Sequence, residues 1–360
     1  MVDSLMEIDN YSRIVPCIAE SYTTNEDKSV WTFQIRDGVK WVDVNGNEKA
    51  DCTSQDFATA MEWILNFHKN ESSQTSDFLI MLEGANEYYE YTKTLSEEEA
   101  FALTAEEGSV FKEMVGVETP DANTLIYRCI GSRPYWDSLS TCLWPMSQAM
   151  VDELGGPAGV KAMNNENMWY NGCYTMTSYV QGNEKIFTKN PLYWDQDCEL
   201  FNTVTVKMVE SNDTMYQLYQ SGEIDTVTLT ESNLKTIYDD PENPYHDYLV
   251  ENPATGTYQI HFNYDKHLED GTPDVNWNTA IANEAFRLSW YYGLDLTEYW
   301  KRTNSINPLS CENEFYSMTG LAYTSDGTDY TELVRQELGL PEIDGQTVAR
   351  LDADKAEQYK

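Results

Sequence analysis

The stretch WTFQIRDGVKW, residues 31–41, changes its pattern once, near its middle. Trp31, Phe33 and Ile35 alternate with polar residues, which is the period of a strand with one buried face. Asp37-Gly38 interrupts the alternation, and an Asp-Gly pair between two such runs is typical of a tight turn. The stretch therefore predicts a β-hairpin, made of a strand, a turn and a second strand, with Trp31 and Trp41 on its inner face.

The whole chain has 360 residues, is 13% aromatic and carries a formal net charge of −38. This length predicts roughly two or three domains, and the aromatic content is enough for large cores. A chain with this much negative charge repels phosphate backbones and anionic lipid surfaces. We therefore expect no nucleic-acid partner. The charge suits solubility in an extracellular setting, and a second interpretation is attraction of cationic ligands.

Seven cysteines and four histidines offer little to a metal ion. No two cysteines form a CxxC pair, no Cys/His group has zinc spacing, and the odd count does not predict a disulfide framework. His261 and His267 are six residues apart, in the segment IHFNYDKH, and we do not expect a metal ion there. The sequence therefore predicts neither a metal nor a cofactor.

Catalytic signatures are also absent from the sequence, which contains no GxGxxG, GxxxxGK[ST], GxSxG or HExxH. We therefore expect no enzyme. Two-carboxylate glycosidase chemistry stays open, because 61 acidic residues make chance pairs unavoidable. Glu97, Glu98 and Glu99 belong to an acidic stretch of helical period, 86–113, and we interpret them as its solvated face.

The sequence shows no apolar run long enough to span a membrane and no signal peptide at its start. It opens directly in a structured pattern and stops inside the helical pattern DADKAEQYK. We therefore interpret the chain as a fragment that lacks both ends, so the missing signal segment says little about location.

Helix and strand patterns continue along the chain. Thr53 is the expected N-cap of a helix with Asp56 as its capping-box partner, and Phe57, Met61, Ile64 and Leu65 fall on one face of that helix. Later segments with strand periodicity are the predicted strands 174–178, 185–189, 204–208, 224–229 and 258–262. Helix periodicity predicts a helix over 212–220 and a long helix from residue 278, followed by a second helix start at Asp295. The order strand 204–208, helix 212–220, strand 224–229 predicts an α/β lobe.

Four blocks in this order resemble the family 5 extracellular solute-binding proteins, the oligopeptide- and dipeptide-binding proteins of bacterial ABC importers. The blocks are AESYTTNEDKSVWTFQIRDGVKW with CTSQDF, NGCYTMTSYVQGNEKIFTKNPLYW, VTVKMVESNDTMYQLYQSGEIDTV, and TYQIHFN with NEAFRLSWYYGLDLTEYW. They span most of residues 1–302. The sequence departs from the family where GLDL, 293–296, replaces AIDR, and the family's carboxy-terminal third has no counterpart.

The resemblance implies an α/β, periplasmic-binding-protein-like fold of type II, with two lobes, an extra α+β domain and a truncated second lobe. Residues 1–15 and 148–254 would form the first lobe, 16–147 the extra domain, and 255–360 the start of the second lobe. Residues 31–41 would then be scaffold, and the ligand would bind in the cleft between the lobes.

The resemblance also implies a function. The chain would be the substrate-binding component of an ABC importer, capturing extracellular peptides and delivering them to the permease subunits without chemical change. It would act as a monomer outside the cytoplasm, in the periplasm or on the cell surface as a lipoprotein.

Ligand-binding positions follow from the same resemblance. Asp3 aligns with an acidic residue near the family's FEG segment, Thr228 and Leu229 follow the GEID block, and Tyr258 is the tyrosine of the TYxxxFN strand. Local packing or capping is the competing interpretation for each of them. Asn171-Gly172 is interpreted as a structural turn.

Other functions stay open. Members of the family bind nickel complexes, haem or oligosaccharides on one scaffold, so the fold does not identify the ligand. A secreted glycosidase that uses a carboxylate pair, or a fragment with no function of its own, are the remaining alternatives.

Overall fold

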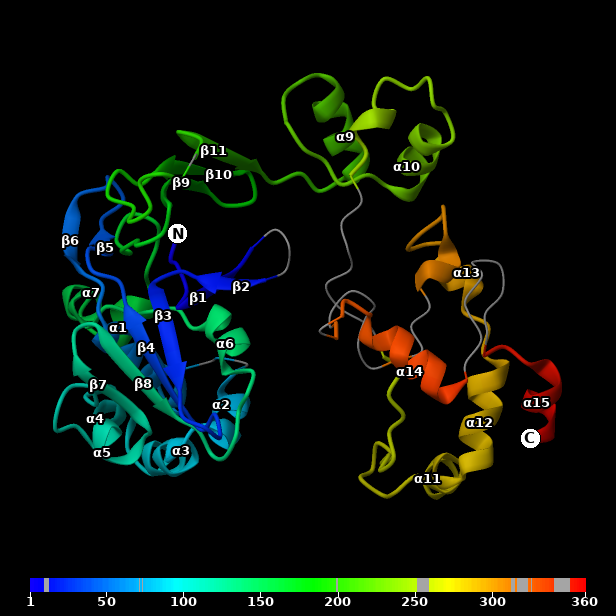
Figure 1. Cartoon of the computed structure of the whole chain (residues 1–360), viewed down its shortest axis with the longest axis horizontal. Helices are drawn as coiled ribbons and strands as arrows, with labels where there is room; N and C mark the ends of the chain where they lie inside the picture. The colour runs from blue at the N-terminus through cyan, green and yellow to red at the C-terminus, as the bar shows by residue number, and fades with distance from the viewer. Residues whose placement is uncertain are drawn as a thin grey trace. The chain divides into compact units, whose positions relative to one another are not determined.

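The computed structural model divides the chain into two compact units, Met1–Met208 and Val209–Lys360. The structure describes residues 1–9, 13–70, 72, 74–198, 200–250, 259–311, 315, 323–324, 326–339 and 350–360 (Figure 1). Each unit is described by itself below.

A four-stranded antiparallel sheet is the centre of the first unit (Figure 1). Its strands, in spatial order, are β3 (Ala19–Thr24), β4 (Val30–Ile35), β8 (Thr124–Arg128) and β7 (Val117–Asp121). The alternation predicted from the sequence is confirmed in β4, where Trp31, Phe33 and Ile35 are at most 2% exposed. These side chains belong to one large apolar core, so residues 31–35 are scaffold.

The predicted hairpin pairing of residues 31–41 is wrong, although both strands exist. β4 pairs with β3 on one edge and with β8 on the other, so it has no free edge for the strand that follows. The chain turns at Gly38, where φ is +81°, and β5 (Lys40–Val42) pairs instead with β6 (Glu48–Asp51). Trp41 is nevertheless buried in the same core, as predicted.

The helix α1 (Ser54–Leu65) packs on β7 and β8 of the sheet. Its start is as predicted, with Thr53 as N-cap and Asp56 completing the capping box. Phe57, Met61 and Leu65 are buried because they recur every four residues and so share one face.

Short helices replace the single acidic helix expected over 86–113. They begin at good N-caps, such as Ser96, whose side chain accepts from the Glu99 N–H. Glu97 and Glu98 are exposed, as expected of a solvated face. The helices of this region and of the segment after the sheet are α2 (Thr75–Met81), α3 (Ala85–Lys93), α4 (Glu97–Phe101), α5 (Val110–Met114), α6 (Trp136–Leu139), η1 (Ser140–Cys142), α7 (Gln148–Glu153) and α8 (Pro157–Lys161).

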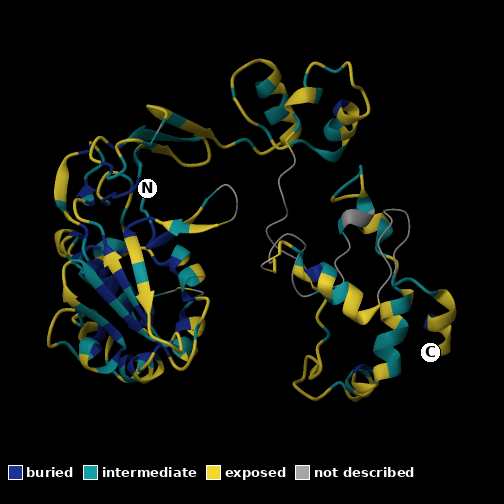
Figure 2. Cartoon of the chain, viewed as in Figure 1, coloured by how far each residue is buried: buried dark blue, intermediate teal, exposed yellow. Residues whose placement is uncertain are grey.

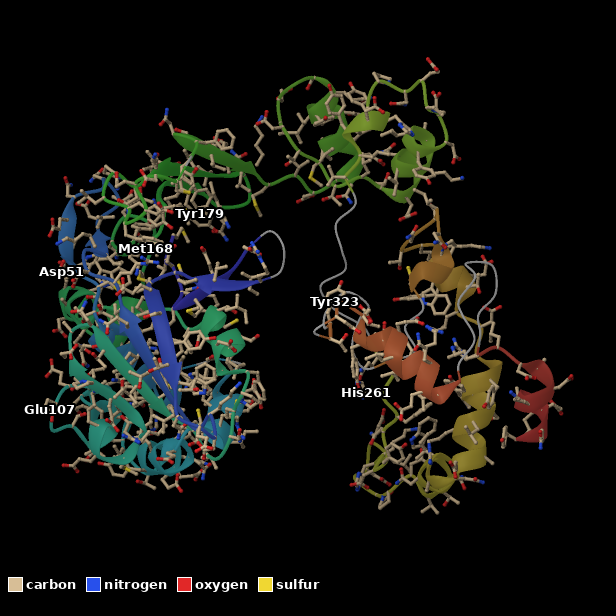
Figure 3. The ribbon with its side chains drawn as sticks, in the orientation of Figure 1. Asp51, Glu107, Met168, Tyr179, His261 and Tyr323 are labelled. Carbon is tan, nitrogen blue, oxygen red and sulfur yellow. The ribbon has the colours of Figure 1, made fainter. Side chains whose placement is uncertain are left out.

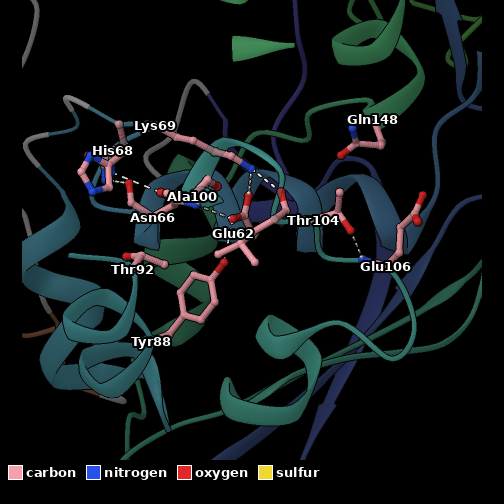
Figure 4. Close-up of polar contacts among 12 residues, drawn as sticks. Glu62, Asn66, His68, Lys69, Tyr88, Thr92, Ala100, Thr104, Glu106 and Gln148 are labelled. Atoms are coloured by element: carbon pink, nitrogen blue, oxygen red, sulfur yellow. Dashed lines mark hydrogen bonds and ion pairs between the residues drawn. The ribbon is translucent and has the colours of Figure 1, made fainter. Parts of the chain in front are cut away.

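A buried ion pair ties these helices to α1 (Figure 4). Lys69 Nζ lies 2.8 Å from Glu62 Oε2, and both side chains are at most 5% exposed. Glu62 Oε1 accepts from the Tyr88 hydroxyl at 2.7 Å and from Asn66 Nδ2 at 2.9 Å. Because every oxygen of the carboxylate has a donor, the charges are buried without an unsatisfied group.

A three-stranded antiparallel sheet follows, in the order β11-β10-β9. Its strands β9 (Tyr174–Val180), β10 (Glu184–Lys189) and β11 (Thr203–Lys207) confirm three predicted strands. Much of this sheet is open to solvent, and Tyr179 on β9 (Figure 3) is 48% exposed. A two-stranded sheet of β1 (Met6–Ile8) and β2 (Ile14–Pro16) completes the unit.

The second unit is helical where the structure describes it. Its helices are α9 (Asn212–Gln220), α10 (Glu231–Tyr238), η2 (His246–Tyr248), α11 (Val275–Ala282), α12 (Glu284–Gly293), α13 (Thr297–Trp300), η3 (Pro308–Cys311), α14 (Tyr330–Leu338) and α15 (Ala353–Gln358). The long helix expected from residue 278 is divided, because Asn283 ends α11 and caps α12. The second start expected at Asp295 is confirmed, since α13 begins at Thr297.

Two strands predicted for the second unit are not formed in its described part. Residues 224–229 and 259–263 have no regular structure there, and Tyr258 lies outside the described residues. An extended segment becomes a strand only when a neighbouring strand takes its N–H and C=O groups, and neither segment has such a neighbour among the described residues. The strand–helix–strand unit predicted over 204–229 is therefore not completed.

Burial also differs between the units (Figure 2). The buried apolar residues described beyond residue 208 are Ile237, Ile281, Trp300 and Ala356. No helix among the described residues is long and apolar enough to cross a membrane.

Candidate functional site

The predicted ligand residue Asp3 lies where three segments of the first unit meet. Its backbone N–H donates to Asn171 Oδ1 at 2.8 Å, and the Gly172 N–H donates to the Met1 carbonyl at 3.0 Å. Leu5 donates to the Leu143 carbonyl at 2.9 Å. The amino-terminal segment is thereby attached to residues far along the chain.

Two aromatic residues, Trp194 and Tyr193, lie beside the carboxylate of Asp3. Trp194 Nε1 donates to Asp3 Oδ2 at 3.1 Å, and Tyr193 stands beside the same carboxylate. Burial raises the pKa of Asp3, while hydrogen bonds from Trp194, Tyr193 and Cys17 work against this shift. Burial, and then the charge of Asp3, raise the pKa of the Cys17 thiol in turn.

The positively charged side chain of Arg36 packs on the Trp194 ring. The Arg36 guanidinium lies 4.4 Å from the centre of the Trp194 ring, a cation–π distance. Arg36 Nε also donates to the Cys17 carbonyl at 2.7 Å. Arg36 belongs to the RDG turn of residues 36–38, so this turn supports the indole that holds Asp3.

Gly172 makes room for the carboxylate. A Cβ at this position would lie 2.7 Å from Asp3 Oδ1 and 3.0 Å from the Met1 carbonyl carbon, so any larger residue displaces Asp3. Asn171 is buried and also reaches Cys52 Sγ at 3.6 Å. The contacts of these two residues are structural, in keeping with the turn expected at Asn171-Gly172.

Sequence reasoning singled out Asp3 but missed Trp194 and Asn171 as its partners, and Arg36 as the residue that packs on Trp194. The NPLYW and RDG motifs were visible, but a motif does not say which distant residue its side chains will touch. The resulting site presents a half-buried carboxylate next to aromatic walls. Such a carboxylate can accept hydrogen bonds from a ligand's N–H or ammonium groups.

Thr228 and Leu229 belong to the second unit, immediately before the N-cap of α10. Thr228 is exposed and Leu229 is half-buried. The Thr230 side chain accepts from the Asn233 N–H, and a shallow polar groove along α10 includes Glu231 and Ser305. Because Tyr258 lies outside the described residues, the grouping of the four predicted positions stays a prediction.

Metal-binding residues do not gather in the part of the chain that the structure describes. No group of three or more His, Cys, Asp or Glu side chains there could hold an ion. His261 (Figure 3) is exposed in the second unit.

A family model described as "Bacterial extracellular solute-binding proteins, family 5 Middle" matches residues 13–306. The chain belongs to this family, as the four sequence blocks predicted.

Curated relatives are oligopeptide-binding proteins. SarA of Streptococcus gordonii is 23% identical over 350 residues, which cover 94% of this chain and 49% of SarA. AliA of Streptococcus pneumoniae is 26% identical, with coverage of 94% and 50%. The chain thus spans about half the length of the curated relatives it matches.

Solved structures of related proteins have the same fold. The substrate-binding domain of an oligopeptide ABC transporter from Bacillus anthracis aligns with a TM-score of 0.63 at 20% identity, covering 99% of this chain and 59% of that one. OppA of Haemophilus influenzae, in complex with the peptide RPPGFSPFR, aligns with a TM-score of 0.53 at 23% identity, with coverage of 66% and 42%. These likenesses confirm the predicted periplasmic-binding-protein-like α/β fold of type II.

Proposed function

We propose that this protein is the substrate-binding component of an ABC importer and captures peptides without changing them chemically. The supporting observation is the family match over residues 13–306, together with relatives named as oligopeptide-binding proteins. Its partners are then an extracellular peptide and the permease subunits. The protein works as a monomer outside the cytoplasm, in the periplasm or as a lipoprotein at the cell surface.

In this proposal the ligand lies between two lobes. Residues 1–15 and 148–254 form the first lobe, 16–147 the extra domain, and 255–360 begin the second lobe. The hydrogen bonds from the amino-terminal segment to Asn171 and Gly172 support the first assignment, because they join residues 1–15 to the region after 148.

Asp3, Thr228, Leu229 and Tyr258 contact the ligand in this proposal. Peptide binders of this kind hold an extended backbone through strand-like hydrogen bonds, and side-chain groups at the edges add selectivity. The Asp3 carboxylate is suited to the peptide's N–H or ammonium groups because it is half-buried and held in place by Trp194.

Calorimetry of the full chain with RPPGFSPFR tests capture, and mass spectrometry of the same mixture tests whether the peptide stays intact. We expect binding of intact peptide, weakened by Asp3→Asn. Glu107→Gln is the control, because Glu107 is exposed (Figure 3). This variant should bind the peptide with the same affinity as the parent. Peptide cleavage, or binding only of nickel complexes, haem or oligosaccharides in parallel titrations, contradicts the proposal.

A further inference from the structure

A cavity of about 150 Å³ lies in the first unit beside α1. Its wall is mostly apolar and includes Phe57, Met61 and Ile64 of α1, with Leu143 facing them from the segment after η1. Neither Asp3 nor its hydrogen-bond partners Asn171 and Trp194 line it. Apolar cavities of about this size in other proteins stay dry and bind benzene.

The cavity reaches the molecular surface. Trp144, which forms part of its lining, is 49% exposed, and the lining residues Cys142 and Ser72 are exposed as well. A small molecule can therefore enter without unfolding the core.

Two polar side chains in the lining make no hydrogen bond within the described part of the chain. Tyr127 is fully buried, and its hydroxyl makes no hydrogen bond among the described residues. The Gln74 side-chain amide also has none there. A ligand with one hydrogen-bonding group can therefore pair with a protein group in this cavity.

We propose that this cavity is a binding site for a small, largely apolar molecule with a single hydrogen-bonding group, of the size and class of phenol. The apolar wall takes the ring, and the Tyr127 hydroxyl takes the polar atom. The volume of the cavity limits the size of the ligand, because a second ring does not fit in 150 Å³. This site is separate from peptide capture and does not depend on it.

The test is titration of the full chain with phenol and with benzene, followed by calorimetry and by the rise in melting temperature that binding produces. We expect both to bind, phenol several-fold more tightly. Tyr127→Phe should keep benzene binding and reduce the preference for phenol. Ala60→Leu, on the lining face of α1, should fill the cavity and weaken both ligands by at least about tenfold.

Leucine suits a helix almost as well as alanine, so Ala60→Leu is expected to fold, and its unliganded melting temperature verifies this. Ala60→Val adds less volume and gives the same test if the leucine variant does not fold. Three results overturn the proposal: no binding to the parent, equal binding to the filled variant, or an unchanged phenol preference in Tyr127→Phe. A cavity that holds only water gives the first of these.

Discussion

At the scale of single residues, Asp56 shows how one side chain serves two elements. Its Oδ2 accepts from the Thr53 N–H at 2.8 Å, which caps α1, and from Trp41 Nε1 at 3.2 Å, which ties β5 to the helix. The residue is only 7% exposed. Burial raises the pKa of Asp56 to about 6, because removing the carboxylate from water costs more than these donors return.

This shift predicts a pH-dependent stability. The folded state holds the Asp56 proton more tightly than the unfolded state, so the contribution of Asp56 is fully present below its ordinary value of 3.8 and is lost as pH rises through about 6. The loss is about 3 kcal/mol. Denaturant unfolding of the parent and of Asp56→Asn from pH 4 to 7 should show the variant gaining relative stability with pH. Glu98→Gln, at an exposed carboxylate, should show no such gain, and a gain of equal size there refutes this assignment.

Trp31 gives a second prediction at this scale. It is 2% exposed and packs against Tyr22 with ring centres 5.1 Å apart. Trp31→Ala should lower the unfolding free energy by roughly 3–5 kcal/mol without changing which peptides bind, because the residue belongs to the core. Thermal melting beside peptide titration measures both. Phe201→Ala, at a 79% exposed ring, should change neither; lost binding with unchanged melting in Trp31→Ala contradicts a scaffold role.

At the scale of elements, the helices around the first sheet are short and depend on specific contacts for their positions. The Glu62–Lys69 pair links the end of α1 to α3 through Tyr88, and Asn66 Nδ2 reaches the Ala100 carbonyl of α4 at 2.9 Å. Burial, and then the neighbouring Glu62, raise the pKa of Tyr88, so its hydroxyl stays a donor. Helices this short are not stable alone, so such contacts determine where they lie.

Breaking this pair should be costly. Lys69→Met leaves the Glu62 carboxylate buried without its cation, which costs roughly 3–5 kcal/mol of unfolding free energy. The double variant Glu62→Gln with Lys69→Met should recover most of that loss, as measured by denaturant unfolding. Lys235→Met, in an ion pair whose side chains are more than half exposed, is the comparison and should cost less than about 1 kcal/mol. Equal losses for both lysine variants contradict this prediction.

At the scale of the whole molecule, the two units differ in how much they bury. The first unit has one large apolar core, whereas α12 of the second unit has no buried residue and Val250 is 80% exposed. Apolar burial is the main source of local stability, so the two units should open with different free energies.

Hydrogen exchange of the full chain should show this difference. Amides of β4 and β8 should exchange only by global unfolding of the first unit, and amides of α12 should exchange at least about a hundredfold faster. Peptide-level mass spectrometry resolves both regions. Equal protection of the amides in α12 and β4 contradicts this prediction, because apolar burial would then not account for the stability of the second unit.

The sequence by itself determined the local structure of the first unit. Period-two alternation predicted β4, β9, β10 and β11, and the Thr53–Asp56 pattern predicted the start of α1, because a strand face and a helix cap depend on residues only a few positions apart. The order of four blocks predicted the family, whereas ligand binding by Asp3 stays a prediction. Only the tertiary structure decided which strands pair. β4 was expected to pair with β5, but it pairs with β3 and β8. It also decided that Trp194 reaches Asp3 and that Arg36 packs on Trp194, because contacts between positions as far apart as Asp3 and Trp194, 191 residues, leave no trace in local periodicity.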